Sequence, residues 1–147
     1  MSIRAMSEPC ATVSLWHGTR FEFDMERNEF ERLVEELLSE LPEEFANKME
    51  NVEFVVEDRA DAKTRRSLGV RSDTMLLGLY QGVPLDVRSP TRYANVLPDR
   101  IVIYQEAIEK TAGRPERVRA VLKRTLFHEI AHYFGISDRR LRELGAY

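Results

Sequence analysis

HEIAHYFGISD, residues 128–138, is the segment of this 147-residue chain that says most about its fold and chemistry. Its first half continues a helical pattern that begins at Pro115. On a helix, His128 and His132 are four residues apart, so their imidazoles project from one face about 40° apart. The spacing therefore predicts a long helix from Pro115 to about Phe134 that carries two histidines one turn apart.

The two histidines have the spacing of a metal site. Two ring nitrogens one turn apart can bind one Zn²⁺ at about 2.0–2.1 Å each. Glu129 follows the first histidine and can take a proton from a water on the open side of the metal. We therefore predict His128 and His132 as zinc ligands and Glu129 as the general base. The alternative is a pair of core histidines beside a solvated glutamate, but burying these groups without a metal is costly.

The third ligand is expected shortly after the helix. Gly135 favours the left-handed conformation that ends helices, and a reversal there brings Asp138 back under the helix. Two histidines and one carboxylate leave a position for water, which is the arrangement of catalytic zinc. Asp138 can also cap a last short helix over Asp138–Leu144, and the two roles can coexist. Glu143 is the substitute ligand if the turn is wider.

The remaining patterns predict an α+β fold. Apolar residues at three- and four-residue steps indicate a helix over Asp24–Leu41. Three apolar runs indicate strands at Val52–Val56, Met75–Tyr80 and Arg100–Tyr104. Consecutive strands followed by helices are typical of α+β proteins. We expect a small mixed sheet of about three to four strands packed on helices.

The first 24 residues differ from the rest of the chain. Thr12–Trp16 and Thr19–Phe23 have apolar residues at alternate positions, so residues 1–24 are expected to be an N-terminal extension that forms a hairpin or is partly ordered. The domain itself is expected over residues 25–147.

Composition excludes several classes of protein. The chain has 22 Lys and Arg against 25 Asp and Glu, so its net charge of -3 does not favour a dedicated nucleic-acid binder. Cys10 is the only cysteine, which excludes an intrachain disulfide and a four-cysteine zinc site. No apolar run approaches the roughly 20 residues that span a bilayer, and no secretory signal is evident. We expect a cytoplasmic protein with no nucleic-acid or membrane partner.

Several other stretches accompany the motif: Leu76–Leu85 (LLGLYQGVPL), Pro98–Ile101 and Leu144-Gly145. Together they resemble a family of small bacterial zincin-like metallopeptidases with a minimal metalloprotease fold, over about residues 25–147. The resemblance implies an active-site helix near the C-terminus, a zinc cofactor and a peptide or protein substrate. It implies the same roles for the residues named above: His128, His132 and Asp138 as ligands and Glu129 as general base.

The resemblance also implies how substrate binds. In zincins an extended peptide pairs with the sheet edge above the metal, and Leu76–Tyr80 is the candidate edge because Gly78 permits close approach of a backbone. A second electrophile is expected to stabilise the oxyanion. Tyr104, Tyr133, Tyr147 and the arginines all remain open for that role.

One departure keeps alternatives open. Larger metzincins continue past the third ligand to a methionine-containing turn and a lower subdomain, whereas nine residues follow Asp138 here, none of them methionine. We expect no lower subdomain and an incomplete substrate cleft. The first hypothesis is a zinc peptidase-like hydrolase, and the alternative is a non-enzymatic zinc-binding or adaptor module derived from a peptidase. A metal-dependent endoribonuclease is a third hypothesis, but that pattern lacks Glu129 and has histidine in place of Asp138.

Overall fold

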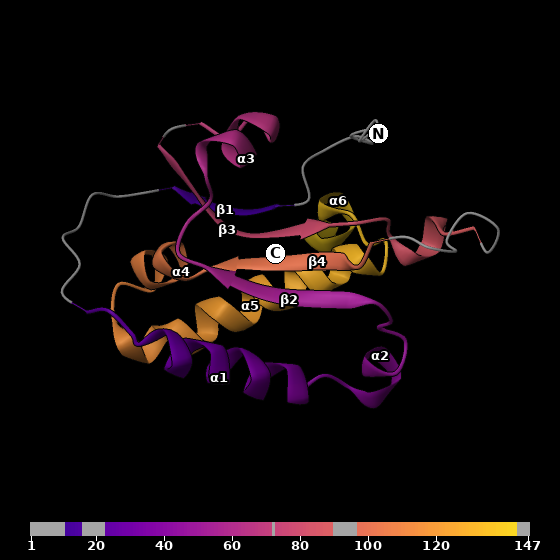
Figure 1. Cartoon of the computed structure of the whole chain (residues 1–147), viewed down its shortest axis with the longest axis horizontal. Coiled ribbons are helices and arrows are strands. Elements are labelled where there is room, and N and C mark those ends of the chain that lie inside the picture. Colours follow the sequence, from indigo (N-terminus) through magenta and orange to yellow (C-terminus); the bar gives the residue numbers. More distant parts are fainter. Residues whose placement is uncertain (1–10, 16–22, 72, 90–96, 144–147) are drawn as a thin grey trace.

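One mixed sheet organises the part of the chain that the computed structural model describes, residues 11–15, 23–71, 73–89 and 97–143 (Figure 1). Its strands are β1 (Ala11–Leu15), β2 (Val52–Glu57), β3 (Thr74–Gln81) and β4 (Asp99–Tyr104). The helices are α1 (Arg27–Ser39), α2 (Glu43–Ala46), α3 (Ala62–Ser67), the 3₁₀ helix η1 (Leu85–Val87), α4 (Gln105–Ala112), α5 (Pro115–Tyr133) and α6 (Asp138–Glu143).

The strand order is β1-β3-β4-β2. β2 pairs with β4 in parallel, whereas β3 pairs with both β4 and β1 in the antiparallel direction. The expected α+β fold with a small mixed sheet is therefore confirmed. Helix α5 carries the predicted site. It packs mainly against three neighbouring strands of this order, β1, β3 and β4.

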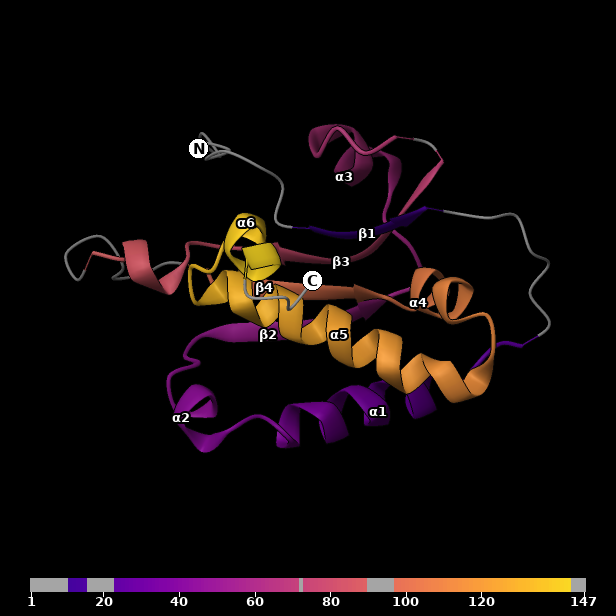
Figure 2. The same ribbon diagram turned by 180° about the vertical axis from the view of Figure 1, so that it is seen from behind.

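Helix α5 crosses one face of the sheet and forms the core with it (Figure 2). Its Val118, Leu122 and Leu126 are fully buried, as are Ile101 of β4 and Phe30 of α1. These side chains recur at three- or four-residue steps on α5, which is the spacing that keeps one face of a helix against a core. The core therefore holds α5 rigidly beneath β3 and β4. None of the described helices is both long and apolar enough to cross a membrane.

Most predicted elements are confirmed, with ends shifted by a few residues, and α4 is the main omission. Its apolar residues, Ala107, Ile108 and Ala112, are too few to give a helical repeat in the sequence. Two buried polar side chains fix its position instead. Gln105 donates to the Met25 carbonyl across 2.6 Å, and Glu109 accepts from the Met25 N–H across 3.1 Å.

Strand β1 changes the expected edge of the sheet. Part of the predicted N-terminal extension, Ala11–Leu15, pairs along the outer side of β3 between Thr74 and Leu79, so most of Leu76–Tyr80 has a neighbour on that side. The expectation of a free edge at Leu76–Tyr80 is wrong for this structure, because the chain supplies its own outer strand. The second strand of the expected hairpin, Thr19–Phe23, lies outside the described residues except for Phe23, which is irregular.

Candidate metal centre

The end of helix α5 has a backbone geometry that turns the chain back on itself. Gly135 has a φ of +83°, in the left-handed region where glycine is favoured. Its N–H donates to the His132 carbonyl across 2.9 Å, and the N–H of Ile136 donates to the Ala131 carbonyl across 3.0 Å. This pair of bonds is the Schellman motif. Gly135 therefore ends the helix where the sequence predicted.

The reversal orients His132. Its Nδ1 lies 2.9 Å from the Ile136 carbonyl oxygen, which can only accept a hydrogen bond. Nδ1 therefore carries the proton, and Nε2 has a free lone pair. A backbone carbonyl on the second ring nitrogen is a common way to orient a metal-binding histidine.

The same reversal brings Asp138 to both imidazoles. Its Oδ1 lies 2.9 Å from His128 Nε2 and 3.0 Å from His132 Nε2. One ligand atom from each of the three residues lies within 4.8 Å of the others, and both histidines are buried. Atoms that share one tetrahedral zinc at about 2.0–2.1 Å lie about 3.4 Å apart, so the group has the right size.

Two alternatives were open for Asp138: that it caps the last helix, and that Glu143 is the ligand in its place. Ser137 Oγ accepts from the Arg140 N–H across 3.3 Å, so Ser137 is the side chain that caps α6. Glu143, the substitute ligand, forms ion pairs with Arg139 and Arg140 at 3.8 and 3.1 Å. The Asp138 carboxylate is thereby left to the histidines.

The buried atoms of the group fit a cation. His132 Nε2 is buried and makes no hydrogen bond with any described residue, although Asp138 Oδ1 lies 3.0 Å away. The contact is close but is not directed as a hydrogen bond, and with the proton on Nδ1 both atoms present lone pairs. Two facing lone pairs in a buried place are stabilised by a positive ion between them. His128, His132 and Asp138 can hold zinc on this ground.

Burial also keeps the histidines in the state that binds metal. The pKa of His128 is lowered by burial, which the neighbouring Asp138 carboxylate partly opposes. The pKa of His132 is lowered by burial and by the adjacent His128. Both rings are therefore neutral at neutral pH, which metal binding requires.

Glu129 is completely buried and lies against strand β3. Its Oε2 accepts a hydrogen bond from the backbone N–H of Tyr80 across 2.9 Å. The alternative of a solvated helix glutamate is therefore wrong. A buried carboxylate held by a backbone donor has a fixed position and orientation.

Gly78 makes room for Glu129. A Cβ at this position would lie 2.9 Å from Thr125 Cγ2 and 3.1 Å from Glu129 Cγ. The sequence predicted a close backbone approach at Gly78, but it was assigned to a substrate. The groups that approach Gly78 are instead side chains of α5, so a larger residue there would displace Glu129.

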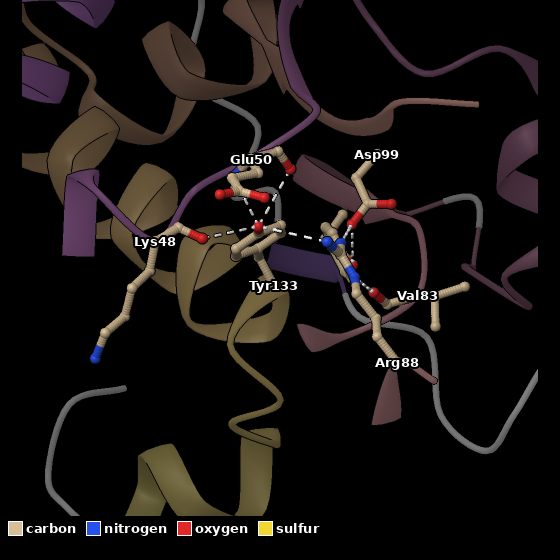
Figure 3. A network of polar contacts seen from close by, with 7 residues as sticks. Lys48, Glu50, Val83, Arg88, Asp99 and Tyr133 are labelled. Carbon is tan, nitrogen blue, oxygen red and sulfur yellow. Dashed lines mark hydrogen bonds and ion pairs between the residues drawn. The ribbon is translucent and has the colours of Figure 1, made fainter. Parts of the chain in front are cut away.

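A second polar network surrounds Tyr133, the last residue of α5 (Figure 3). The Tyr133 hydroxyl accepts from the Glu50 N–H across 3.0 Å and lies 3.2 Å from the carbonyls of Lys48 and Glu50. The Arg88 guanidinium lies over the Tyr133 ring, 4.8 Å from its centroid, and forms a buried ion pair with Asp99. The Tyr133 hydroxyl is therefore occupied by a structural contact.

The other candidates for stabilising an oxyanion are also placed. Burial raises the pKa of Tyr104 to about 12. Tyr80 was not among the candidates; its hydroxyl donates to Asp99 across 2.7 Å, and burial with that carboxylate raises the pKa of Tyr80 above its ordinary value. Tyr147 lies outside the described residues. Among the arginines, Arg88 is committed to Asp99.

A largely apolar cavity of about 450 Å³ opens beside the first histidine. It lies between α5 and α6, and its lining comprises Ala120, Lys123, Arg124, Phe127, His128 and Leu141. Among these residues, Lys123 forms an ion pair with Glu40 at 2.7 Å. A cavity of this size can take one large side chain.

The sequence predicted the four candidate side chains of the site, but it did not predict the groups that orient them. The Tyr80 N–H and the Ile136 carbonyl are backbone atoms, which every residue has, so no residue type marks them. Arg88 and Asp99 were missed as a pair because nothing in the sequence relates a charge after η1 to a charge at the start of β4. Asp99 stood within Pro98–Ile101, a stretch that had been noticed only for its resemblance.

Comparison with known protein families gives a match over most of the chain. A family model described as zincin-like metallopeptidase matches residues 49–146, which are 98 of the 147 residues. No curated protein matches the chain. The matched segment contains β2, β3, β4 and α5, and with them the histidines, Glu129 and Asp138.

Proposed function

Because this chain belongs to the zincin-like metallopeptidase family, we propose that it hydrolyses peptide bonds with a bound zinc ion. The ligands in this proposal are His128, His132 and Asp138. Glu129 is the general base. The observation that supports it most directly is the Asp138 oxygen that lies within 3.0 Å of both imidazoles, one of which has a buried Nε2 with no hydrogen bond.

The proposed chemistry divides between the metal and the protein. Bound zinc supplies a nucleophilic water at neutral pH and polarises the carbonyl of the scissile bond. Glu129 takes the proton of the attacking water and passes it to the leaving amine. The Tyr80 N–H holds one oxygen of Glu129 during both transfers, so the base does not have to be reoriented.

The cavity beside His128 is the proposed place for a side chain of the substrate. Phe127 and Leu141 line it, so a peptide with a large apolar residue next to the scissile bond is preferred. Replacing Phe127 with Trp narrows the cavity. In a peptide library the variant is expected to shift toward smaller side chains, and an unchanged profile would place the side chain elsewhere.

Metal analysis and hydrolysis on one preparation test the proposal. Purified protein is expected to hold one zinc per chain and to cleave a library of unstructured peptides but not RNA. Stoichiometric zinc without turnover of any peptide would favour the non-enzymatic adaptor. Cleavage of RNA alone would favour the endoribonuclease.

A further inference from the structure

The outer edge of β3 runs past Glu129, and the chain's own strand β1 lies along that edge. In the antiparallel register Thr12 is opposite Gly78 and Ala11 is opposite Leu79. Gly78 is the residue against which Glu129 packs. β1 therefore follows β3 directly to the place where the base contacts the strand, and it also lies against α5.

The Glu129 carboxylate takes the place that the next backbone partner of β3 would have if β1 were longer. A strand N–H points sideways, to where the carbonyl of a neighbouring strand would lie. The N–H of Tyr80, one residue beyond the last one that β1 pairs with, donates to Glu129. Any extended segment that pairs with β3 in the direction of β1 and reaches past Leu79 therefore meets the Glu129 carboxylate.

The pairing of β1 is short and irregular. It has five residues, and its register shifts between Thr12 and Val13, so that Leu77 has no partner in β1. A bulge of this kind disrupts the ladder locally. The β3–β4 pairing on the inner side has no such shift over Gly78–Gln81. Because β1 is the edge strand, pairs only with β3 and carries the register shift, it can separate without breaking the other strand pairings.

We propose that β1 occupies the binding site of an extended peptide substrate and that its displacement opens the enzyme. The substrate class is an unstructured segment that adds to β3 as an antiparallel strand by backbone hydrogen bonds. A segment without the register shift of β1 pairs continuously from Thr74 to Leu79, because it also pairs with Leu77, which β1 skips. Such a strand competes with β1 and places its end beside Glu129, which keeps the Tyr80 N–H. This inference rests on the proposed function.

Native-state hydrogen exchange on the unmodified full chain tests the first step. Amides in the β1–β3 pairing are expected to exchange through local opening, with protection at least about 100-fold lower than that of Val102 and Ile103 in β4. Equal protection would mean that β1 separates only when the whole domain unfolds, and it would overturn the proposal.

A pair of variants tests the second step. Val13→Pro with Ser14→Pro removes two consecutive N–H groups, one of which faces β3 because neighbouring strand residues alternate. The matched control is Val13→Thr with Ser14→Thr, which keeps both donors and favours a strand. The probe is a labelled peptide with the sequence of residues 8–17, added to metal-free protein. It is expected to bind the proline variant at least about tenfold more tightly than the control, because the edge is no longer occupied. Equal affinities would contradict the proposal.

Peptide hydrolysis by the zinc-loaded proteins separates this inference from the proposed function. The proline variant is expected to have a lower KM for extended peptides. Tighter probe binding without hydrolysis by any variant would remove the proposed function and leave β3 as a peptide-binding edge. Hydrolysis with the same KM in both variants would keep the function and remove the role of β1.

Discussion

The Glu129 carboxylate accepts a hydrogen bond from the backbone N–H of Tyr80 across 2.9 Å, which joins helix α5 to strand β3. The two residues are 49 positions apart in sequence. Because the donor belongs to the backbone, no side-chain substitution at Tyr80 removes it except proline. The position of the Glu129 carboxylate is therefore set by the docking of α5 on β3 and not by the helix alone.

Glu129→Gln is expected to keep zinc and to lose hydrolysis. Glutamine has nearly the same shape, and its carbonyl oxygen can accept from Tyr80, but it does not take a proton. A general base contributes about 10²–10⁴-fold to rate, so kcat/KM should fall by about that factor. Zinc content and kcat/KM measured on the same sample check this. Activity at the wild-type level would exclude Glu129 as the base.

Asp138→Ala is expected to release the metal. The substitution removes the oxygen that lies within 3.0 Å of both imidazoles. Loss of one of three protein ligands should lower zinc affinity by well over tenfold, measured by competition with a chromogenic chelator. The matched control is Glu143→Ala, whose carboxylate is paired with Arg139 and Arg140. If Glu143→Ala loses zinc and Asp138→Ala retains it, the ligand assignment is wrong.

Gly78→Ala is expected to disturb the base without removing the metal. The new Cβ meets Thr125 Cγ2 at 2.9 Å and Glu129 Cγ at 3.1 Å. Overpacking of this kind costs about 1–3 kcal/mol of stability and shifts side chains. We expect unchanged zinc stoichiometry, a lower kcat and a lower midpoint in urea. Thr125→Ser removes the closer methyl group. The double variant Gly78→Ala with Thr125→Ser should therefore be more stable than Gly78→Ala alone. No regain would mean that the contact with Thr125 is not the cause.

Asp99→Ala should be among the most destabilising substitutions. Asp99 and Arg88 form an ion pair whose side chains are only 2% and 8% exposed. Removing one member leaves a buried charge unpaired, which costs about 3–5 kcal/mol. Urea unfolding is measured for Asp99→Ala, which removes one charge of the pair, and for the double variant Arg88→Met with Asp99→Leu, which replaces both charges with apolar side chains. The double variant should be the more stable of the two, and the reverse order would exclude a buried-charge effect.

The metal-free protein should lose stability as the pH falls below about 6.5. Burial lowers the pKa values of His128 and His132 in the folded state, so between the folded and unfolded pKa values the unfolded chain binds more protons. The stabilisation is complete above the unfolded value and is lost as the pH falls through the folded values. Urea titrations in a chelator at pH 7 and pH 5 measure this. His128→Asn with His132→Asn should flatten the dependence, and an unchanged slope would assign it to other groups.

Elements that are stabilised by contacts between residues close in sequence could be predicted, whereas elements that depend on residues far apart in sequence could not. The HEIAHYFGISD segment contains its own helix stop and brings its own residues together, so periodicity and one glycine were enough to anticipate the helix and the turn. Strands β2, β3 and β4 were found because each contains a short apolar run. α4 was missed because its helix is stabilised by contacts of Gln105 and Glu109 with Met25, about 80 positions away.

The occupied edge of β3 could not be foreseen for a similar reason. Alternation in Thr12–Trp16 indicates a strand but does not say with which strand it pairs, since backbone pairing is the same for every residue type. A hairpin with the adjacent Thr19–Phe23 was the simplest choice because local partners cost the least chain entropy. The observed partner, β3, begins about 60 residues later.

The turn at Gly135 has a consequence for the order in which the protein assembles. His128, His132 and Asp138 lie within eleven consecutive residues, so only a short loop must close to bring them together. The contact between Glu129 and Tyr80 requires the sheet to be in place. In the proposed enzyme the three candidate ligands can thus come together on α5 and α6 alone, whereas Glu129 reaches its position only when α5 docks on β3.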